Sequence, residues 1–247
     1  MGGEYLSNIN KIPKIIHYCW FGRGEKPDIV KRCIKSWRRI LKNYEIKEWN
    51  EDSFDINSNN FVKQAYENKK YAFVSDYVRV YALHNYGGIY LDTDVEVIQN
   101  FDKYLENDSF WGFEVGDYIA TSTIGAVKEN KLIKMFLDSY DGKTFLNEDG
   151  SFNVTTNVKI VSEIFEDLGV KLNGEYQEIE GIGSVYPLEI FSPYDYRYYE
   201  ELSNKDTVCI HHYYKSWLPL TERVKQIIKK IAIKLIGGKR IKKLVNN

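Results

Sequence analysis

The sequence predicts an α/β fold with a central mixed sheet, and three observations support this class. The chain has 247 residues, a length that suits one α/β domain. Hydrophobic residues make up 43% of it, which is enough for a sizeable core. Strand patterns alternate with helix patterns in the first half and cluster in the second half. We therefore expect a single domain over residues 1–222 and a separate tail over residues 223–247.

The elements of the first half follow from apolar periodicity and from helix-start signals. Pro27 suits the start of a helix, because proline has no N–H to lose there. Residues 44–49 alternate in polarity, which is typical of a strand. In chain order we expect a strand at 14–20, a helix from Pro27 to about Leu41, a strand at 44–49, a polar cap at 57–60 and a helix at 61–68.

A longer helix and a short strand follow. Apolar residues recur at i, i+3 and i+4 over residues 72–86, which predicts a helix. Gly87 and Gly88 end it, because glycine enters the left-handed conformation at low cost. Ile89–Leu91 is then an apolar strand, which Glu96–Ile98 is expected to continue. In the second half we expect helices at 132–140 and 154–168, and strands at 176–179, 185–190 and 207–212.

Asp92 and Asp94 come directly after the short strand. Side chains two residues apart point to the same side of a strand, so both carboxylates converge at a strand end, where ligand sites are common in α/β sheets. Divalent cations are often held by one or two carboxylates together with substrate phosphates. The pair therefore predicts a metal site for a substrate that carries a diphosphate. A solvated turn is the alternative, because the D-x-D pattern is also frequent in turns.

Asp76 and Arg79 are i, i+3 neighbours on the predicted helix. An exposed ion pair at this spacing would contribute about 0.2–0.5 kcal/mol to stability. Because the helix ends just before the strand that leads to Asp92, the pair could instead face the same cleft. The sequence leaves both interpretations open.

Composition and charge argue against several classes of protein. Residues 1–222 carry a net charge of about −10, which argues against a nucleic-acid-binding core. The odd number of cysteines, Cys19, Cys33 and Cys209, argues against a disulfide framework. Residues 1–10 lack the apolar centre of a signal peptide, and no apolar run approaches the ~20 residues that span a bilayer. We expect a protein of the reducing cytoplasm.

Three segments, taken in order, resemble one family of enzymes. Residues 75–95 read S-D-Y-V-R-V-Y-A-L-H-N-Y-G-G-I-Y-L-D-T-D-V and resemble the signature of glycosyltransferases with the DXD sugar-binding region. Residues 12–22 resemble the opening strand of that family, and residues 211–217 resemble its closing His…Ser-Trp element. The nearest group is glycosyltransferase family 32, which includes yeast initiating mannosyltransferases and bacterial capsule enzymes. The clostridial glucosylating toxins share a similar core.

The resemblance implies a glycosyltransferase A fold, with a Rossmann-like nucleotide-binding half and a central mixed sheet. It also implies a nucleotide-sugar donor, with a UDP-linked sugar favoured over a GDP-linked one, and Mn²⁺ or Mg²⁺ as cofactor. The residue roles that it implies are base stacking by Trp20, close approach of the base at Gly22, nucleotide contact by Tyr90, donor-sugar contact by Asp76 and Arg79, metal binding by Asp92 and Asp94, and closure over the diphosphate by Ser216 and Trp217. For Trp20, a position in the core is the alternative.

The closing strand is expected to supply a third metal ligand. His211 and His212 are adjacent, so they face opposite sides of a regular strand, and only one of them can enter the site. The sequence does not say which. For either one alone, a hydrogen-bonded structural histidine is the alternative.

Taken together, these implications predict a retaining hexosyltransferase with a surface-polysaccharide or lipid-linked oligosaccharide acceptor. A bound cation would neutralise the departing nucleoside diphosphate. Front-face attack is the favoured hypothesis, because no carboxylate can be assigned to a double displacement. Two alternatives remain: a toxin-type enzyme that modifies a protein acceptor, and a non-enzymatic interaction module.

The C-terminal tail is strongly basic. Between Arg223 and Lys243 it contains nine Lys or Arg and no acidic residue, and its apolar residues fall on one arc of a helix. A basic amphipathic helix is typical of binding to a membrane surface. We expect peripheral association with the inner face of the membrane; a helix packed on the domain is the alternative.

Overall fold

The computed structural model describes residues 11–198 and 200–214, together with Lys225 and Ile233. Ser216 and Trp217 lie outside the described residues, as does nearly all of the predicted basic helix, so their roles stay predictions. Among the described residues, no helix is both long enough and apolar enough to cross a membrane.

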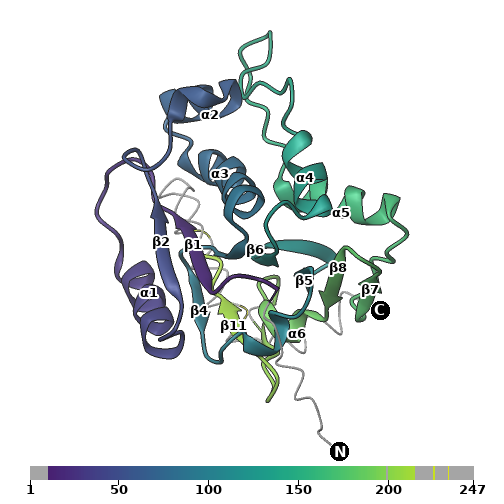
Figure 1. The fold of residues 1–247 in the computed structure, drawn as a ribbon. Coiled ribbons are helices and arrows are strands. Elements are labelled where there is room, and N and C mark those ends of the chain that lie inside the picture. Colours follow the sequence, from purple (N-terminus) through teal and green to yellow (C-terminus); the bar gives the residue numbers. More distant parts are fainter. Residues whose placement is uncertain (1–10, 199, 215–224, 226–232, 234–247) are drawn as a thin grey trace, which may run out of the picture.

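A seven-stranded mixed sheet forms the centre of the molecule, which confirms the predicted fold class (Figure 1). Its strand order is β2-β1-β3-β6-β5-β8-β7. The first three strands of this order are parallel, whereas β6 runs antiparallel to both β3 and β5, and β7 runs antiparallel to β8. The strands are β1 (Ile15–Cys19), β2 (Glu45–Trp49), β3 (Gly88–Leu91), β5 (Ser109–Glu114), β6 (Tyr118–Ala126), β7 (Gln177–Ile179) and β8 (Gly183–Tyr186).

Helices cover both faces of this sheet, and each face has its own apolar cluster (Figure 1). One face is covered by α2 (Asn60–Glu67), α3 (Tyr71–Tyr86), α4 (Lys131–Asp138) and α5 (Asn157–Asp167). The other is covered by α1 (Asp28–Ile40), α6 (Leu188–Phe191), β4 (Val95–Val97) and β11 (Cys209–His211). Within β3, Tyr90 faces the first cluster, and Ile89 and Leu91 face the second, as the two-residue period of a strand requires.

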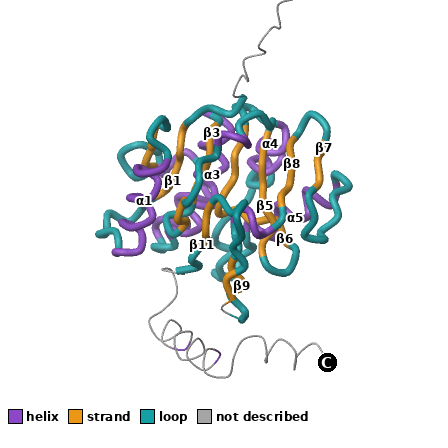
Figure 2. Tube along the Cα trace, turned by 90° about the horizontal axis from the view of Figure 1, so that it is seen from below, coloured by secondary structure: helices purple, strands orange, loops and turns teal. Residues whose placement is uncertain are grey.

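Short elements complete the fold. Two 3-10 turns cover Ile56–Ser58 and Asp102–Tyr104. A two-stranded pair of β9 (Tyr194–Asp195) and β10 (Glu200–Glu201) follows α6 in the chain. In Figure 2, β9 projects from the body of the molecule beyond the strands of the central sheet.

The predicted elements of the first half are confirmed, with ends shifted by one or two residues. Two predictions of strands are wrong. Residues 185–190 do not form one strand, because Pro187 ends β8 and caps α6. Glu96–Ile98 does not continue the central sheet, because β4 pairs with β11 in a separate two-stranded sheet.

The long β5–β6 hairpin was not predicted, although it lies at the centre of the sheet. Eight of the nine residues of β6 are buried, as are five of the six residues of β5. A strand that is buried on both faces shows no alternation of polar and apolar residues, so its sequence lacks the period on which the other assignments rest.

His17 is a buried residue of β1 whose hydrogen bonds link β1 to β2 and to the end of α3. Its Nδ1 accepts a hydrogen bond from the indole N–H of Trp49 (3.1 Å), which can only donate. The hydrogen of the ring is therefore on Nε2, which donates to the Gly87 carbonyl (2.8 Å) at the end of α3. Burial lowers the pKa of His17 to about 4, so the ring is neutral at physiological pH.

We expect the protein to lose stability as the pH falls from 6.5 to about 4. Over this range the His17 ring gains a proton in the unfolded chain, where its pKa is 6.5, but stays neutral in the folded protein, where its pKa is about 4. The expected loss from this group is about 3 kcal/mol of the free energy of unfolding. Urea unfolding between pH 7 and 4 measures it. The matched control is His17→Gln, which can make both hydrogen bonds but cannot titrate. Equal pH slopes for the two proteins would contradict this assignment.

Candidate metal and substrate site

The two aspartates lie in the turn that carries the chain out of the central sheet. Beyond Leu91, the Asp92 N–H donates to the Ser122 carbonyl of β6 (2.8 Å), and the Val95 N–H donates back to the Asp92 carbonyl (3.0 Å). The turn therefore begins on β3 and ends at β4. Asp92 and Asp94 project from it at the end of β3, where the sequence places them.

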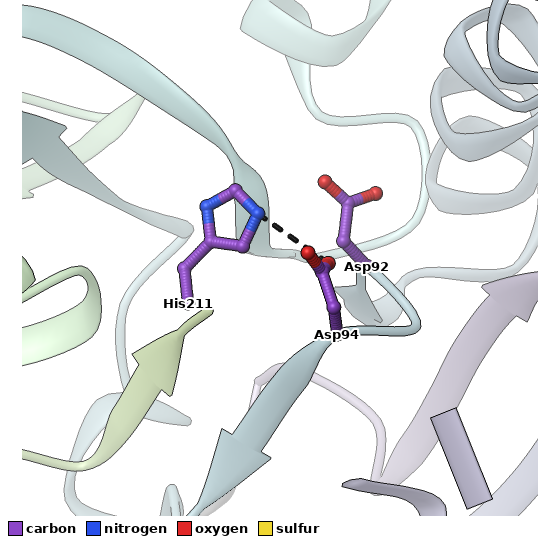
Figure 3. A group of neighbouring side chains, drawn as sticks. All are labelled: Asp92, Asp94 and His211. Carbon is purple, nitrogen blue, oxygen red and sulfur yellow. Dashed lines mark ion pairs between the residues drawn. The ribbon is translucent and has the colours of Figure 1, made fainter. Parts of the chain in front are cut away.

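His211 reaches the same point from β11. This strand pairs antiparallel with β4, and His211 lies opposite Val95, the residue after Asp94. Its Nε2 is 3.4 Å from the Asp94 carboxylate. One ligand atom from each of Asp92, Asp94 and His211 lies within 4.8 Å of the others, and Figure 3 shows the three side chains converging.

His212, the residue that follows β11, points away from the two aspartates toward Glu96. Its Nε2 is 2.9 Å from a carboxylate oxygen of Glu96, and Arg32 lies 4.0 Å from the same carboxylate. The two adjacent histidines therefore separate as the period of a strand requires, and the structure places His211, not His212, beside the two aspartates.

The chain beyond β11 wraps around Asp94. The N–H of Tyr214 donates to the Asp94 carboxylate (2.7 Å), and the N–H of His212 donates to the Asp94 carbonyl (3.1 Å). Tyr213 adopts a left-handed backbone (φ 49°), and its ring packs on His211 at 3.9 Å between centroids. Sequence reasoning missed both tyrosines, and a backbone N–H leaves no signal in a sequence because nearly every residue carries one.

Asp94 and His211 stabilise each other's charged forms. Burial disfavours both charges, but their attraction outweighs it: the His211 ring, together with the Tyr214 N–H, lowers the pKa of Asp94 to about 2. In return, the Asp94 carboxylate raises the pKa of His211 above its ordinary value.

The donor set fits a hard divalent cation. Two carboxylates and one imidazole are ligands that Mn²⁺ accepts, and Mg²⁺ accepts the carboxylates readily. Ligands on opposite sides of one such ion are about 4.2 Å apart, which is close to the 4.8 Å within which the three ligand atoms lie. His211 directs Nε2 at the aspartates, while its buried Nδ1 has no hydrogen-bond partner in the described part of the chain.

Arg79 lies beside this cluster and is not the exposed surface residue of one interpretation, because only 5% of it is accessible. One guanidinium nitrogen donates to the Thr121 carbonyl of β6 (2.5 Å). The other donates to Asp76 (2.7 Å) and lies 3.2 Å from Asp92. Arg79 therefore joins α3, β6 and the metal-site turn through a planar fork that lysine cannot reproduce.

Tyr90 and Asp76 complete the surroundings of Arg79. The guanidinium lies over the Tyr90 ring (4.7 Å to its centroid), and the Tyr90 hydroxyl donates to Asp92 (3.1 Å). Burial raises the pKa of Asp76 to about 6 in spite of the charge of Arg79. The Asp76 carbonyl accepts a hydrogen bond from Asn157 at the start of α5 (2.9 Å).

Trp20 and Gly22 follow the C-terminal end of β1, and their contacts described below are with residues outside this cluster. The Trp20 ring is half-buried, donates to the Gly24 carbonyl (2.7 Å) and has Lys26 over it. Gly22 has a φ of +92°, and a Cβ there would lie 2.3 Å from the Tyr71 ring. The space opened by this glycine is thus filled by Tyr71, and the predicted approach of a base to Gly22 stays a prediction.

We expect His211→Ala to weaken Mn²⁺ binding by more than about 10-fold, because it removes one of three ligands. His212→Ala is the matched control, since it removes an adjacent histidine that faces Glu96. Titration of each purified protein with Mn²⁺, followed by calorimetry, measures the two affinities. An equal loss in both variants would contradict the placement of His211.

The same titration is expected to depend on pH. The Asp94 carboxylate raises the pKa of His211 above its ordinary value, so a proton competes with the metal for Nε2. The apparent affinity for Mn²⁺ should therefore fall as the pH drops through that pKa and level off above it. An affinity for Mn²⁺ that does not change with pH would show that His211 is not a ligand.

The chain is similar in sequence to one protein family and to a viral enzyme. Residues 4–148, more than half of the chain, match the family described as capsular polysaccharide synthesis proteins. An uncharacterized glycosyltransferase of Acanthamoeba polyphaga mimivirus is 25% identical over 218 residues, which cover 84% of each chain.

Solved structures with a similar arrangement are also known. PaToxG glycosyltransferase is 18% identical, with a TM-score of 0.44 over 64% of this chain and 70% of its own. A glycosyltransferase involved in the glycosylation of the major capsid of PBCV-1 is 13% identical, with a TM-score of 0.45 over 90% of this chain and 100% of its own.

Proposed function

The chain belongs to the capsular polysaccharide synthesis protein family and is a glycosyltransferase, and we propose that it is a metal-dependent, retaining hexosyltransferase. The observation that carries this proposal is the convergence of Asp92, Asp94 and His211 at the end of β3. Two carboxylates and an imidazole in this position suit an ion that binds the diphosphate of a nucleotide-sugar. We propose Mn²⁺ or Mg²⁺ as the ion and a UDP-linked hexose as the donor.

The chain's own residues supply the rest of the donor site in this proposal. When bound, the ion acts as a Lewis acid that neutralises the leaving diphosphate. Arg79 provides a fixed positive charge beside Asp92, in a buried position where electrostatic stabilisation is strong. Asp76 holds the guanidinium in place and is the predicted contact of the donor sugar.

We propose that the configuration at the anomeric carbon is retained. The acceptor hydroxyl would attack the face from which the nucleoside diphosphate departs, and a phosphate oxygen would take its proton. A double displacement would need a carboxylate as the nucleophile. Among the described residues, the carboxylates nearest the cluster are engaged elsewhere, since Asp92 and Asp94 face the metal position and Asp76 pairs with Arg79, and this supports front-face attack. The acceptor would be a hydroxyl of a surface polysaccharide or of a lipid-linked oligosaccharide, a choice that the family supports.

The test is a hydrolysis screen of UDP- and GDP-linked hexoses by the purified protein, with Mn²⁺, with Mg²⁺ and with EDTA. We expect hydrolysis of a UDP-linked hexose that stops when EDTA removes the metal. Hydrolysis that persists in EDTA would contradict the metal requirement. A preference for GDP-linked donors would overturn the proposed base but not the reaction.

We also propose that residues 223–247 hold the protein at the inner face of the cytoplasmic membrane. The support is the sequence: nine basic residues without an acidic one, on a predicted amphipathic helix. Each basic side chain near an anionic surface contributes about 1 kcal/mol. A lipid-linked acceptor would then lie close to the site.

Truncation after Glu222 is expected to abolish binding to anionic liposomes. The full chain should sediment with phosphatidylserine-containing vesicles at low salt and be released at high salt, because the attraction is electrostatic and screened by ions. Neutral phosphatidylcholine vesicles are the control. Equal sedimentation of the full and truncated proteins would remove the proposal.

A further inference from the structure

A second candidate site lies on the loop that joins α4 to α5. In Figure 1 this loop rises above the helices at the top of the view. It contains an open depression of about 600 Å³ at the start of α5. The side chains that line it include Asn147, Phe152, Asn153, Val154, Thr155 and Lys159.

The depression is built on a loop that is fixed in place. The side-chain carbonyl of Gln64, on α2, accepts the N–H groups of both Phe145 and Leu146 (2.8 and 3.0 Å). The N–H of Asn153 donates to the Phe145 carbonyl (2.8 Å), and the Phe152 ring stacks on Phe145 with 5.1 Å between centroids. The loop therefore presents its side chains in a defined arrangement before any ligand binds, which lowers the entropic cost of binding.

The lining has the chemistry of a carbohydrate site. Phe152 is 37% exposed and Val154 is 60% exposed, so both offer apolar surface to a ligand in the depression. The amides of Asn147 and Asn153 and the hydroxyls of two threonines, Thr155 and Thr156, also line the depression and can both donate and accept hydrogen bonds, and the Lys159 ammonium can donate. In the described part of the chain, no carboxylate is among the lining residues. An aromatic surface ringed by amides and hydroxyls suits the apolar faces and the hydroxyls of sugar rings.

The depression is joined to the donor site through α3. Asn157, the first residue of α5, donates to the Asp76 carbonyl (2.9 Å) and accepts the Tyr140 hydroxyl. Phe73, one turn before Asp76, packs on Phe145 under the loop (5.0 Å between ring centroids). A ligand in the depression would thus lie on the same side of α3 as the first turn of α5, which contacts the backbone of Asp76.

We propose that this depression binds the glycan chain of the acceptor. A sugar ring would pack against Val154 and the exposed part of Phe152, whose ring also stacks on Phe145 and has the Lys70 ammonium over it. The inference rests on the proposed function, since a transferase needs a second sugar site beside its donor site. Saccharide units behind the reacting hydroxyl would occupy the depression. It would therefore determine which glycans are extended.

The experiment is binding of the full-length protein to an array of defined oligosaccharides. Biotinylated protein is assembled on streptavidin, so that several weak contacts add up to a measurable signal. Phe152→Ala removes the ring, and Val154→Arg fills the depression at a position too exposed to affect folding. Met135→Ala is the matched control, because Met135 is a 40% exposed apolar residue on α4 outside the depression.

We expect the wild-type protein and Met135→Ala to bind the same glycans, and Phe152→Ala and Val154→Arg to lose at least 10-fold of that signal. Two results would overturn the inference: no binding of any glycan by the wild-type protein, or equal binding by wild type and both variants. Hydrolysis of nucleotide-sugars by the wild-type protein is measured separately. No hydrolysis by the wild-type protein would count against the proposed function. Hydrolysis by the wild-type protein, together with equal glycan binding by wild type and both variants, would count against the depression alone.

Discussion

Replacing Asp94 with alanine is expected to abolish sugar transfer while leaving the fold intact. Asp94 contributes a carboxylate to the candidate metal site, and it is held there by the Tyr214 N–H and by His211. Loss of several kcal/mol of charge stabilisation corresponds to a fall in kcat/KM of about 1,000-fold or more. Donor hydrolysis in saturating Mn²⁺ measures the rate, and circular dichroism measures the fold.

Glu96→Ala is the matched control for this variant. Glu96 is an acidic residue of β4, two positions after Asp94, but its carboxylate contacts His212 and Arg32. Its removal should change kcat/KM by no more than about threefold, since partly exposed ion pairs contribute little. Near-normal turnover of Asp94→Ala, with the metal still required, would refute the assignment of Asp94.

Arg79→Lys is expected to lower kcat/KM by about 100- to 1,000-fold, although it preserves the charge. The guanidinium serves the Thr121 carbonyl, Asp76 and Asp92 at once, from two nitrogens of a planar fork. A lysine ammonium is a single point and cannot occupy both nitrogen positions. The Thr121 carbonyl should also lose the hydrogen bond that Arg79 donates to it inside the protein. We therefore expect the thermal midpoint of unfolding to fall as well.

Arg32→Lys is the control for the replacement of a guanidinium by an ammonium group. Arg32 is an exposed arginine of α1, 4.0 Å from Glu96. Its replacement should leave both kcat/KM and the thermal midpoint close to wild type. If Arg79→Lys and Arg32→Lys have the same kcat/KM, Arg79 is a structural residue and has no role at the donor.

The sequence alone was enough to predict the helices and strands in which apolar residues recur at a regular spacing. The helix over residues 71–86 was predicted almost to its ends, because apolar residues recur on one side and two glycines follow. The position of Asp92 and Asp94 at the end of an apolar strand was predicted for the same reason. The rule that adjacent strand residues face opposite sides also required that only one of His211 and His212 reach the aspartates.

Tertiary structure decided what depends on contacts between distant segments. The choice of His211 over His212 follows from the register of β11 on β4, which pairs residues more than 110 positions apart. Arg79 is buried because the β6 backbone supplies a carbonyl acceptor, and β6 itself was not visible in the sequence. A buried strand has no polar face, and register is a property of two segments together. For these physical reasons, the local pattern predicted the ligands, while the packing of the chain determined how they converge.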